Sequence, residues 1–304
     1  MIPPFRSWLI LLGKLGSWWL ILIWATACRG FPTQAPRPAG QLHVDFLDVG
    51  QGDSTLIRSP SGKTVLIDGG PSDAAAGVDA FLNQNGVHAL DFVLLTHRHA
   101  DHLGGLRVVV ERHGARMFMD APYPHDIPEY RRLLAVLDRQ RVLVRQAEYG
   151  RTIDLGGGAQ LTLLGPPQPP IVGTRSDVNA NSVTSRLDCG KLSVLFAADV
   201  QAQTERWLLE AQANLRAVIL KVSHHGSRTS TTPKFLQAVQ PWLAIISVGA
   251  GNEYRHPDPT TIERLQQVGA RVLRTDRDGP IAIESDCEKI YVSVRGHKEL
   301  LRAP

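Results

Sequence analysis

Hydrophobic and polar residues alternate over short stretches in the first half of the chain, which is the period of a half-buried β-strand. Residues 42–49 alternate in this way, and strands at 54–58 and 63–67 flank the hairpin signal Pro60-Ser61-Gly62. Residues 91–96 form an apolar run typical of a buried strand. Helical spacing of apolar residues predicts helices at 74–86, 103–113 and 129–140.

The second half repeats this alternation of short strands and helices. Its pattern predicts strands at 142–148, 161–164, 182–188, 191–197, 217–222, 242–248, 271–275 and 280–284, and helices at 201–211, 233–239 and 259–269. Two strand-rich halves punctuated by helices predict an α/β sandwich, in which helices cover the outer faces of two sheets.

Residues 1–28 have the layout of an export signal. Basic residues precede a short apolar run at 15–24, and the small residues Ala25-Thr26-Ala27 lead into Cys28. This cysteine resembles the lipidated cysteine of bacterial lipoproteins, and an uncleaved membrane anchor is the alternative. Both predict an extracytoplasmic protein held at the membrane by an N-terminal lipid or anchor, while cleavage of a plain signal would give a secreted protein.

The remaining organisation follows from composition. Residues 29–41 are rich in proline and glycine and predict a tether, followed by one domain at 42–296 and a tail at 297–304. The chain is 43% hydrophobic and 20% charged, an ordinary globular balance. Its net charge of +4 permits an anionic substrate without indicating a nucleic-acid-binding protein. Its three cysteines are too few and too far apart for a thiolate zinc site, but a Cys189–Cys287 disulfide is an option outside the cytoplasm.

Candidate chemistry is concentrated directly after the buried strand at 91–96. His97, His99, Asp101 and His102 fall within six residues and are followed by a pair of glycines. Imidazole and carboxylate groups are the usual ligands of Zn²⁺, and added oxygen donors also suit Mn²⁺. In a tight loop, His97 and His99 can face one ion while Asp101 and His102 face another. We therefore expect two divalent metal ions, Zn²⁺ or Mn²⁺.

This cluster resembles the H-x-H-x-D-H motif of the metallo-β-lactamase superfamily, which implies a four-layer αββα sandwich. Asp68, in Ile67-Asp68-Gly69-Gly70, resembles the aspartate that braces the metal loop in that superfamily. Asp199 stands where the superfamily places a carboxylate that bridges two ions. The resemblance implies a hydroxide shared between the two ions as the nucleophile, oriented by Asp101.

A pair of histidines follows the strand at 217–222. The superfamily supplies its last histidine ligand here, in His224-His225-Gly226-Ser227. The sequence does not say which histidine binds metal. We expect His224 to be the ligand and His225 to contact the substrate or protonate the leaving group.

The segments 46–54, 220–227 and 252–257 narrow the resemblance to the metallo-hydrolase domain of ComEC-type competence proteins, over about residues 42–295. Members of that family are thought to be phosphodiesterases or nucleases. The resemblance places Ser227 and His256 in the site wall. Lys221 either offsets phosphate charge or is a lysine at a sheet edge.

One histidine common in superfamily hydrolases is missing between the main motif and Asp199. His113 and His125 fall in a predicted helix and a proline-rich loop, and the stretch Asn179-Ala180-Asn181-Ser182 takes the expected place. Asn181 or Ser182 then replaces the ligand, or simply caps a strand. Ala198 also stands where the family usually has glycine.

The sequence thus predicts a metal-dependent hydrolase of a phosphodiester substrate, with DNA among the candidates. One alternative is a hydrolase of a β-lactam or thioester, because a metal site activates water toward any electrophile. Another is a non-catalytic envelope lipoprotein that binds nucleic acid or wall polymer. Arginines at 131, 132, 139, 141 and 145 form either a face that follows phosphates or a solvated helix face.

Overall fold

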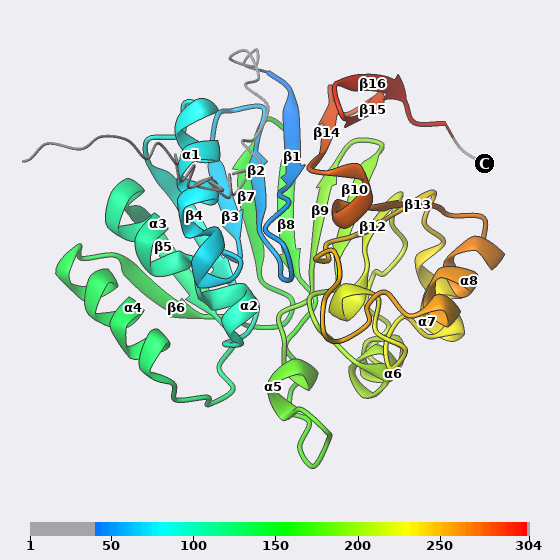
Figure 1. The fold of residues 1–304 in the computed structure, drawn as a ribbon, viewed down its shortest axis with the longest axis horizontal. Coiled ribbons are helices and arrows are strands. Elements are labelled where there is room, and N and C mark those ends of the chain that lie inside the picture. Colours follow the sequence, from blue (N-terminus) through cyan, green and yellow to red (C-terminus); the bar gives the residue numbers. More distant parts are fainter. Residues whose placement is uncertain (1–39, 303–304) are drawn as a thin grey trace, which may run out of the picture. The chain divides into compact units, whose positions relative to one another are not determined.

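Two β-sheets packed face to face, with helices on both outer sides, make up the part of the chain that the computed structural model describes, residues 40–302 (Figure 1). This is the αββα sandwich that the sequence predicts. The export segment at 1–28 and the tether up to residue 39 lie outside the described residues, so both stay predictions. Among residues 40–302, no helix has both the length and the apolar character needed to cross a bilayer.

The first sheet has nine strands in the order β16-β15-β14-β1-β2-β3-β4-β5-β6. Its strands pair antiparallel from β16 to β3 and parallel from β3 to β6. Their bounds are β1 Leu42–Phe46, β2 Thr55–Arg58, β3 Thr64–Ile67, β4 Leu90–Leu95, β5 Ala115–Asp120, β6 Leu143–Gln146, β14 Ile281–Ser285, β15 Ile290–Val294 and β16 His297–Leu300.

The second sheet has seven strands in the order β13-β12-β11-β10-β9-β8-β7. Strands β10 to β13 run parallel and β7 to β10 antiparallel. Their bounds are β7 Thr152–Gly156, β8 Ala159–Leu163, β9 Ser185–Cys189, β10 Leu192–Phe196, β11 Ile219–Lys221, β12 Leu243–Ile246 and β13 Arg271–Arg274.

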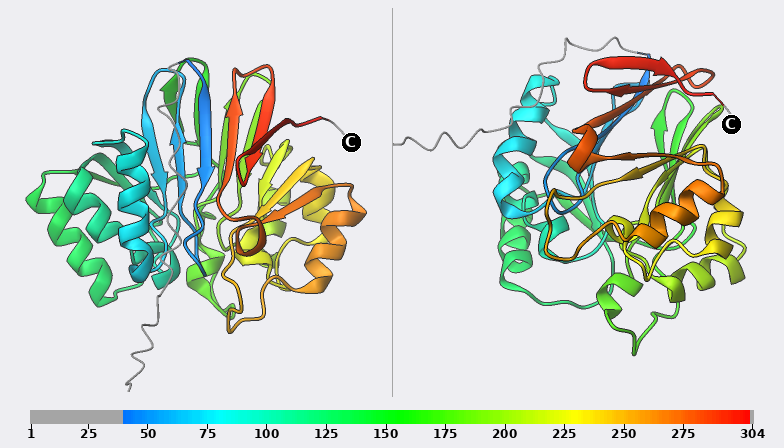
Figure 2. Two further views of the ribbon diagram at one scale, coloured as in Figure 1. Left: turned by 45° about the horizontal axis from the view of Figure 1, so that its top comes forward. Right: turned by 45° about the vertical axis from the view of Figure 1, so that its right-hand side comes forward.

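Helices cover the outer face of each sheet because their apolar sides need a partner surface. On the first sheet lie α1 and α3 with α4, and on the second lie α6, α7 and α8 (Figure 2). The bounds are η1 Ser72–Ala74, α1 Ala75–Gln84, α2 Ala100–Leu103, α3 Leu106–His113, α4 Pro128–Arg139, α5 Asp177–Ala180, α6 Ala202–Glu210, η2 Ser223–Gly226, α7 Pro233–Val239, α8 Pro259–Gln267 and α9 Thr275–Asp278.

The central core fills the space between the two sheets. Phe46 of β1 and Phe196 of β10 are buried there with ring centroids 6.0 Å apart. A disulfide between Cys189, at the end of β9, and Cys287, in the β14–β15 connection, also links the two sheets. The two cysteines are 98 residues apart in the sequence. The disulfide that the sequence left open is therefore present in the structure.

The structure corrects the predicted helix at 103–113, which is broken into α2 and α3 at Gly104-Gly105. The break lets the chain pack tightly, since a Cβ on Gly105 would lie 2.1 Å from the carbonyl oxygen of Gly69. Four strands were not predicted: β5, β7, β15 and β16. The last lies in the segment expected to be a tail. All four residues of β16 are exposed, so only its pairing with β15 defines it and no alternation marks it in the sequence.

Candidate metal centre

The predicted metal-binding residues meet at one edge of the sandwich. Asp68 follows β3, the H-x-H-x-D-H segment follows β4, Asp199 follows β10 and His224 follows β11. Strands β3 and β4 are parallel neighbours, as are β10 and β11. The carboxyl ends of parallel strands open at the same edge of a sheet, which is where α/β proteins place their sites. Both sheets therefore contribute to one centre.

Four side chains converge most closely. Donor atoms of Asp101, His102, Asp199 and His225 all lie within 4.8 Å of one another. His225 Nε2 lies 3.1 Å from Asp101 Oδ2 and 3.6 Å from Asp199 Oδ2. His102 Nε2 lies 3.4 Å from Asp199 Oδ1. Two imidazoles and two carboxylates facing one point form a donor set suited to a divalent cation.

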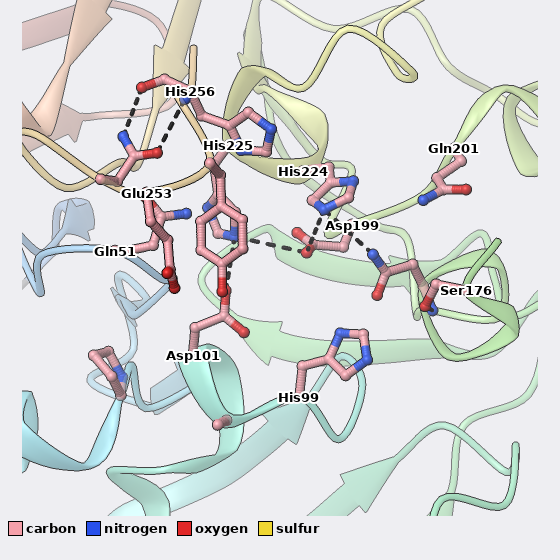
Figure 3. A pocket seen from close by; sticks show the side chains of 15 residues that line it. Gln51, His99, Asp101, Ser176, Asp199, Gln201, His224, His225, Glu253 and His256 are labelled. Atoms are coloured by element: carbon pink, nitrogen blue, oxygen red, sulfur yellow. Dashed lines mark hydrogen bonds and ion pairs between the residues drawn. The ribbon is translucent and has the colours of Figure 1, made fainter. Parts of the chain in front are cut away.

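Two more imidazoles approach Asp199, at the same oxygen as His225. His97 Nε2 and His224 Nε2 lie 3.7 Å and 3.8 Å from Asp199 Oδ2. The His99 ring stands edge-on to the His97 ring, with centroids 4.8 Å apart. In Figure 3, Asp199 lies between His99 and Asp101 on one side and His224 and His256 on the other. The Asp199 carboxylate is thus surrounded by imidazoles, with His102 at Oδ1 and His97, His224 and His225 at Oδ2.

Unsatisfied polar atoms show that the centre fits a metal. Within the described residues, His97 Nε2, His102 Nε2 and Asp199 Oδ1 are buried and have no hydrogen-bond partner. Leaving such atoms unpaired costs free energy, so a native site normally provides a partner for them. All three belong to the convergent donors, and a cation among them would satisfy them together.

The electrostatics of the histidines point the same way. Burial lowers the pKa of His97 well below its usual value and also lowers those of His99 and His224, which keeps these rings in the neutral form that binds metal. Burial works against a charged His225 as well, but the carboxylates of Asp199 and Asp53 raise its pKa to about 10. Ionised carboxylates here attract positive charge, which a metal ion would supply.

Asp68 braces the loop from behind, in the manner that the resemblance implies. It is fully buried, and its Oδ2 lies 2.8 Å from His102 Nδ1. The backbone N–H and the hydroxyl of Thr96 donate to the two carboxylate oxygens of Asp68, each at 2.8 Å. A carboxylate on the far nitrogen of a histidine fixes the ring orientation and raises its basicity toward metal.

Lys221 plays a different part from both sequence interpretations. Strand β11 lies inside the second sheet, between β10 and β12, so Lys221 is not at a sheet edge. Nor does it line the pocket, because its buried ammonium group donates to Asp53 Oδ2. Asp53 Oδ1 lies 3.4 Å from His225 Nδ1. Lys221 and Asp53 therefore form a buried ion pair between the two sheets, directly behind His225.

The pocket over the centre has a volume of about 720 Å³, within the usual range of small-molecule sites. Ser176 and Gln201 lie on one side of it, and Gln51 and Glu253 on the other (Figure 3). The residues lining it are Gln51, Pro71, His99, Ala100, Asp101, Ser176, Asn179, Asp199, Gln201, His224, His225, Asn252, Glu253, Tyr254 and His256. The predicted wall position of His256 is thus observed.

Three other residues that the sequence places at the site, as ligand replacements or wall residues, are absent from this lining. Asn181 is buried and bonds to the backbone of Ile171 and Asp177, and Ser182 donates to the Asn179 carbonyl. The hydroxyl of Ser227 pairs with that of Thr229. All three hold loops in place. Asn179 reaches the pocket instead, with its Nδ2 3.4 Å from His224 Nε2. The sequence of residues 179–182 therefore indicates an amide side chain at the site, but it does not determine which of the two asparagines supplies it.

Both consecutive histidines face the centre, so the structure adds His225 to the expected ligand His224. His224 and His225 have φ angles of 49° and 52°, so the chain turns sharply and sends the two side chains apart. His225 is buried, with Nδ1 2.9 Å from the Ser247 carbonyl and Nε2 at Asp101. His224 lines the pocket beside Asn179. The geometry favours His225 as the ligand grouped with Asp101, His102 and Asp199, and leaves it no free nitrogen for the substrate.

Two further residues shape the loops. Ala198 has φ 50°, a backbone conformation that favours glycine and explains why glycine is usual there. Arg98, between the two ligands of the H-x-H segment, donates twice to Asp120 Oδ2, at 2.7 and 3.0 Å. Its guanidinium carbon lies 3.9 Å from the ring centroid of Tyr130. Arg98 therefore anchors the metal loop to β5 and α4, a role that sequence reasoning missed.

His113, His125 and the arginines singled out in the sequence do not line the pocket. His113 Nε2 lies 2.9 Å from Asp79 Oδ1, in the core beneath α1, whereas the ring of His125 stands edge-on to His99 at 5.7 Å. Arg131, Arg132 and Arg139 pair with Asp126, Glu129 and Glu111. These pairs are typical of a solvated helix face and argue against a surface that follows phosphates.

Comparison with known proteins gives consistent matches. The family model described as Metallo-beta-lactamase superfamily matches residues 47–249. ComE operon protein 3 of Bacillus subtilis is 29% identical over 81% of this chain and 33% of its own length. Recombination protein 2 of Haemophilus influenzae is 31% identical over 82% of this chain and 29% of its own length. The chain spans about a third of the length of these relatives, and the predicted resemblance to the ComEC type is confirmed.

Solved structures confirm the fold. The metallo hydrolase Igni18 from Ignicoccus hospitalis superposes with a TM-score of 0.51 at 15% identity, covering 79% of this chain and 98% of that one. At this identity the likeness shows the arrangement of the sheets and helices and does not extend to activity.

Proposed function

The chain belongs to the metallo-β-lactamase superfamily as a metallo-hydrolase, and from this premise we propose that it is a phosphodiesterase, with DNA as the first substrate to test. The observation that carries the proposal is the position of Asp199, whose carboxylate lies within 4 Å of four imidazole nitrogens. His102 approaches one oxygen, and His97, His224 and His225 approach the other. A carboxylate so placed suits two divalent ions side by side. A recombination protein among the relatives makes DNA the first choice.

The ligands divide into two sets around Asp199. His97, His99 and His224 would hold one ion, and Asp101, His102 and His225 the other. His224, next to Asn179, would then take the place of the histidine missing between the main motif and Asp199. When bound, the two ions would lower the pKa of water and neutralise charge on the phosphoryl oxygens.

The chain's own residues orient these groups. Asp68 holds His102 through Nδ1, and the Ser247 carbonyl holds His225 through Nδ1. Burial and the neighbouring imidazoles lower the pKa of His256 to about 4, so this pocket residue is a neutral hydrogen-bonding group at pH 7. Asn179 and Gln201 add uncharged donors to the wall. With the ions bound, the pocket would hold positive charge at its centre, beside a wall that is neutral at Asn179, Gln201 and His256 and negative at Glu253.

We also propose that the protein works outside the cytoplasm, attached to the membrane through its N-terminal segment. The disulfide between Cys189 and Cys287 supports this, because such bonds persist in oxidising compartments. The test is fractionation of cells expressing the full chain or the Cys28→Ser variant. Lipidation predicts that the wild type stays with the membrane and the variant is released, whereas an uncleaved anchor retains both.

The enzymatic test is hydrolysis of fluorescent single- and double-stranded DNA by the full chain with Mn²⁺ or Zn²⁺. Asp199→Ala should abolish cleavage, while Asp154→Ala, at an exposed position of β7, should retain it. Cleavage that survives Asp199→Ala would exclude this site. Absence of cleavage with both metals would reject a nuclease, and hydrolysis of a chromogenic cephalosporin would then favour the lactamase alternative.

A further inference from the structure

An aromatic ring stands exposed at the wall of the metal pocket. Tyr254 lies in the connection between β12 and α8, and 59% of its surface is accessible. Among the described residues that line the pocket, it is the one Phe, Tyr or Trp. Burial of a large ring normally stabilises a fold, so an exposed ring beside a catalytic centre is suited to contact a ligand.

The connection holds this ring in a defined orientation. Asn252 Nδ2 donates to the carbonyls of Gly249 and His256, at 2.9 and 2.7 Å, and the His256 N–H donates to Asn252 Oδ1 at 3.0 Å. The Tyr254 ring stacks on the His256 ring, with centroids 5.8 Å apart and planes 28° apart. The His256 ring in turn meets His224 edge-on at 5.5 Å. Tyr254 is thus connected through two ring contacts to a proposed metal ligand.

The charges around the ring select what it binds. Glu253 is exposed at the same wall, and its carboxylate disfavours a phosphate lying over Tyr254. A neutral flat group meets no such repulsion. A quaternary ammonium group would suit the negative charge, but such groups are bound by cages of several aromatic rings, and this wall offers a single ring. A nucleobase therefore fits the wall best.

We infer that Tyr254 forms a stacking subsite for the base of the nucleotide that adjoins the phosphodiester at the metal centre. This inference rests on the proposed phosphodiesterase function and narrows its substrate to nucleotide-containing esters. Stacking on one ring is tolerant of base identity, so the subsite recognises single-stranded or unstacked nucleotides without sequence preference.

The test is fluorescence anisotropy with the full chain and Mn²⁺, using phosphorothioate-linked oligothymidylate and an abasic oligomer of the same length and linkage. Tyr254→Ala should weaken oligothymidylate binding about fivefold or more. It should leave binding of the abasic oligomer unchanged. Tyr254→Phe keeps the ring and should bind like wild type. Tyr149→Ala is the matched control, because Tyr149 is also exposed, at 40%, but does not line the pocket.

Three outcomes overturn the inference: equal loss for both oligomers, no loss for either, or a Tyr254-dependent displacement of the oligomer by phosphocholine. Hydrolysis of bis(4-nitrophenyl) phosphate by the wild type separates this inference from the proposed function. Hydrolysis without base-dependent binding sinks the stacking subsite alone. Base-dependent binding without any hydrolysis supports the subsite and sinks the phosphodiesterase.

Discussion

Replacing Lys221 with methionine should destabilise the protein by several kcal/mol, because Asp53 would keep its charge in a buried site without its partner. The two side chains are 3% and 8% exposed. Burial alone would raise the pKa of Asp53, yet Lys221 and His225 lower it from 3.8 to about 2. One pKa unit corresponds to about 1.4 kcal/mol, so the net effect of burial and the positive surroundings favours ionised Asp53 by roughly 2–3 kcal/mol.

This range agrees with the general cost of breaking a buried ion pair by removing one partner, which is about 3–5 kcal/mol. Methionine keeps an unbranched apolar stem of similar length, so the loss reports the charge and not a cavity. We therefore expect Lys221→Met to lower the free energy of unfolding by about 2–5 kcal/mol. The double variant Asp53→Asn/Lys221→Met should recover part of that loss, since no unpaired charge remains.

Urea unfolding followed by far-ultraviolet circular dichroism measures the effect as a shift of the midpoint at constant slope. Lys191→Met is the matched control, because Lys191 pairs with Glu288 on the exposed surface and should leave the midpoint almost unchanged. The reasoning is refuted if Lys221→Met shifts the midpoint no more than Lys191→Met. A double variant that loses the sum of both single losses would equally show that the two charges do not interact.

Three more predictions follow from the same contacts. Thr96→Val removes the hydroxyl that bonds Asp68 and should weaken metal affinity about 10–100-fold in competition with a fluorescent chelator, whereas Thr96→Ser should not; equal affinities would contradict the bracing role. Although burial opposes it, hydrogen bonds from His113 and Arg112 lower the pKa of Asp79. The ionised carboxylate therefore stabilises the folded state at pH values above its unfolded pKa of about 3.9. This stability is lost as the pH falls through the lower pKa of the folded state. Between pH 3 and 6, unfolding free energy should fall less steeply for Asp79→Asn than for wild type, and parallel curves would be the contrary result. Reducing the Cys189–Cys287 disulfide should cost about 4–5 kcal/mol for a loop of this length and lower the melting temperature, whereas Cys28→Ser should not alter the melting temperature of the domain.

The ligand types and the fold class could be predicted from the sequence because both are written in local patterns. An apolar run ending in His97, His99, Asp101 and His102 specifies a buried strand followed by a polar loop, whatever the rest of the chain does. The paired glycines that follow are part of the same motif. Their structural effect, the break between α2 and α3, could not be predicted because it depends on the close approach of Gly69 to Gly105. Alternation likewise predicted most strands of both sheets.

Side-chain roles that depend on direction could not be predicted. His224 and His225 are neighbours of the same type, and only two successive left-handed residues decide that His225 turns toward Asp101 while His224 turns toward Asn179. In the same way Asn179 reaches the centre, while Asn181, two residues later in the chain, donates to the backbone carbonyls of Asp177 and Ile171. A composition signal gives the residue type at such a place but not the orientation of each side chain.

The sequence by itself therefore determined that this protein is an αββα sandwich with a histidine and aspartate centre at the ends of its strands. Only the tertiary structure decided that Lys221 is buried against Asp53, that four imidazoles surround the Asp199 carboxylate, and that Tyr254 stands at the wall of the same pocket. The physical reason is that each of these contacts joins segments far apart in the chain. Their geometry is set when the two sheets pack against each other, and periodicity along the chain carries no information about that packing.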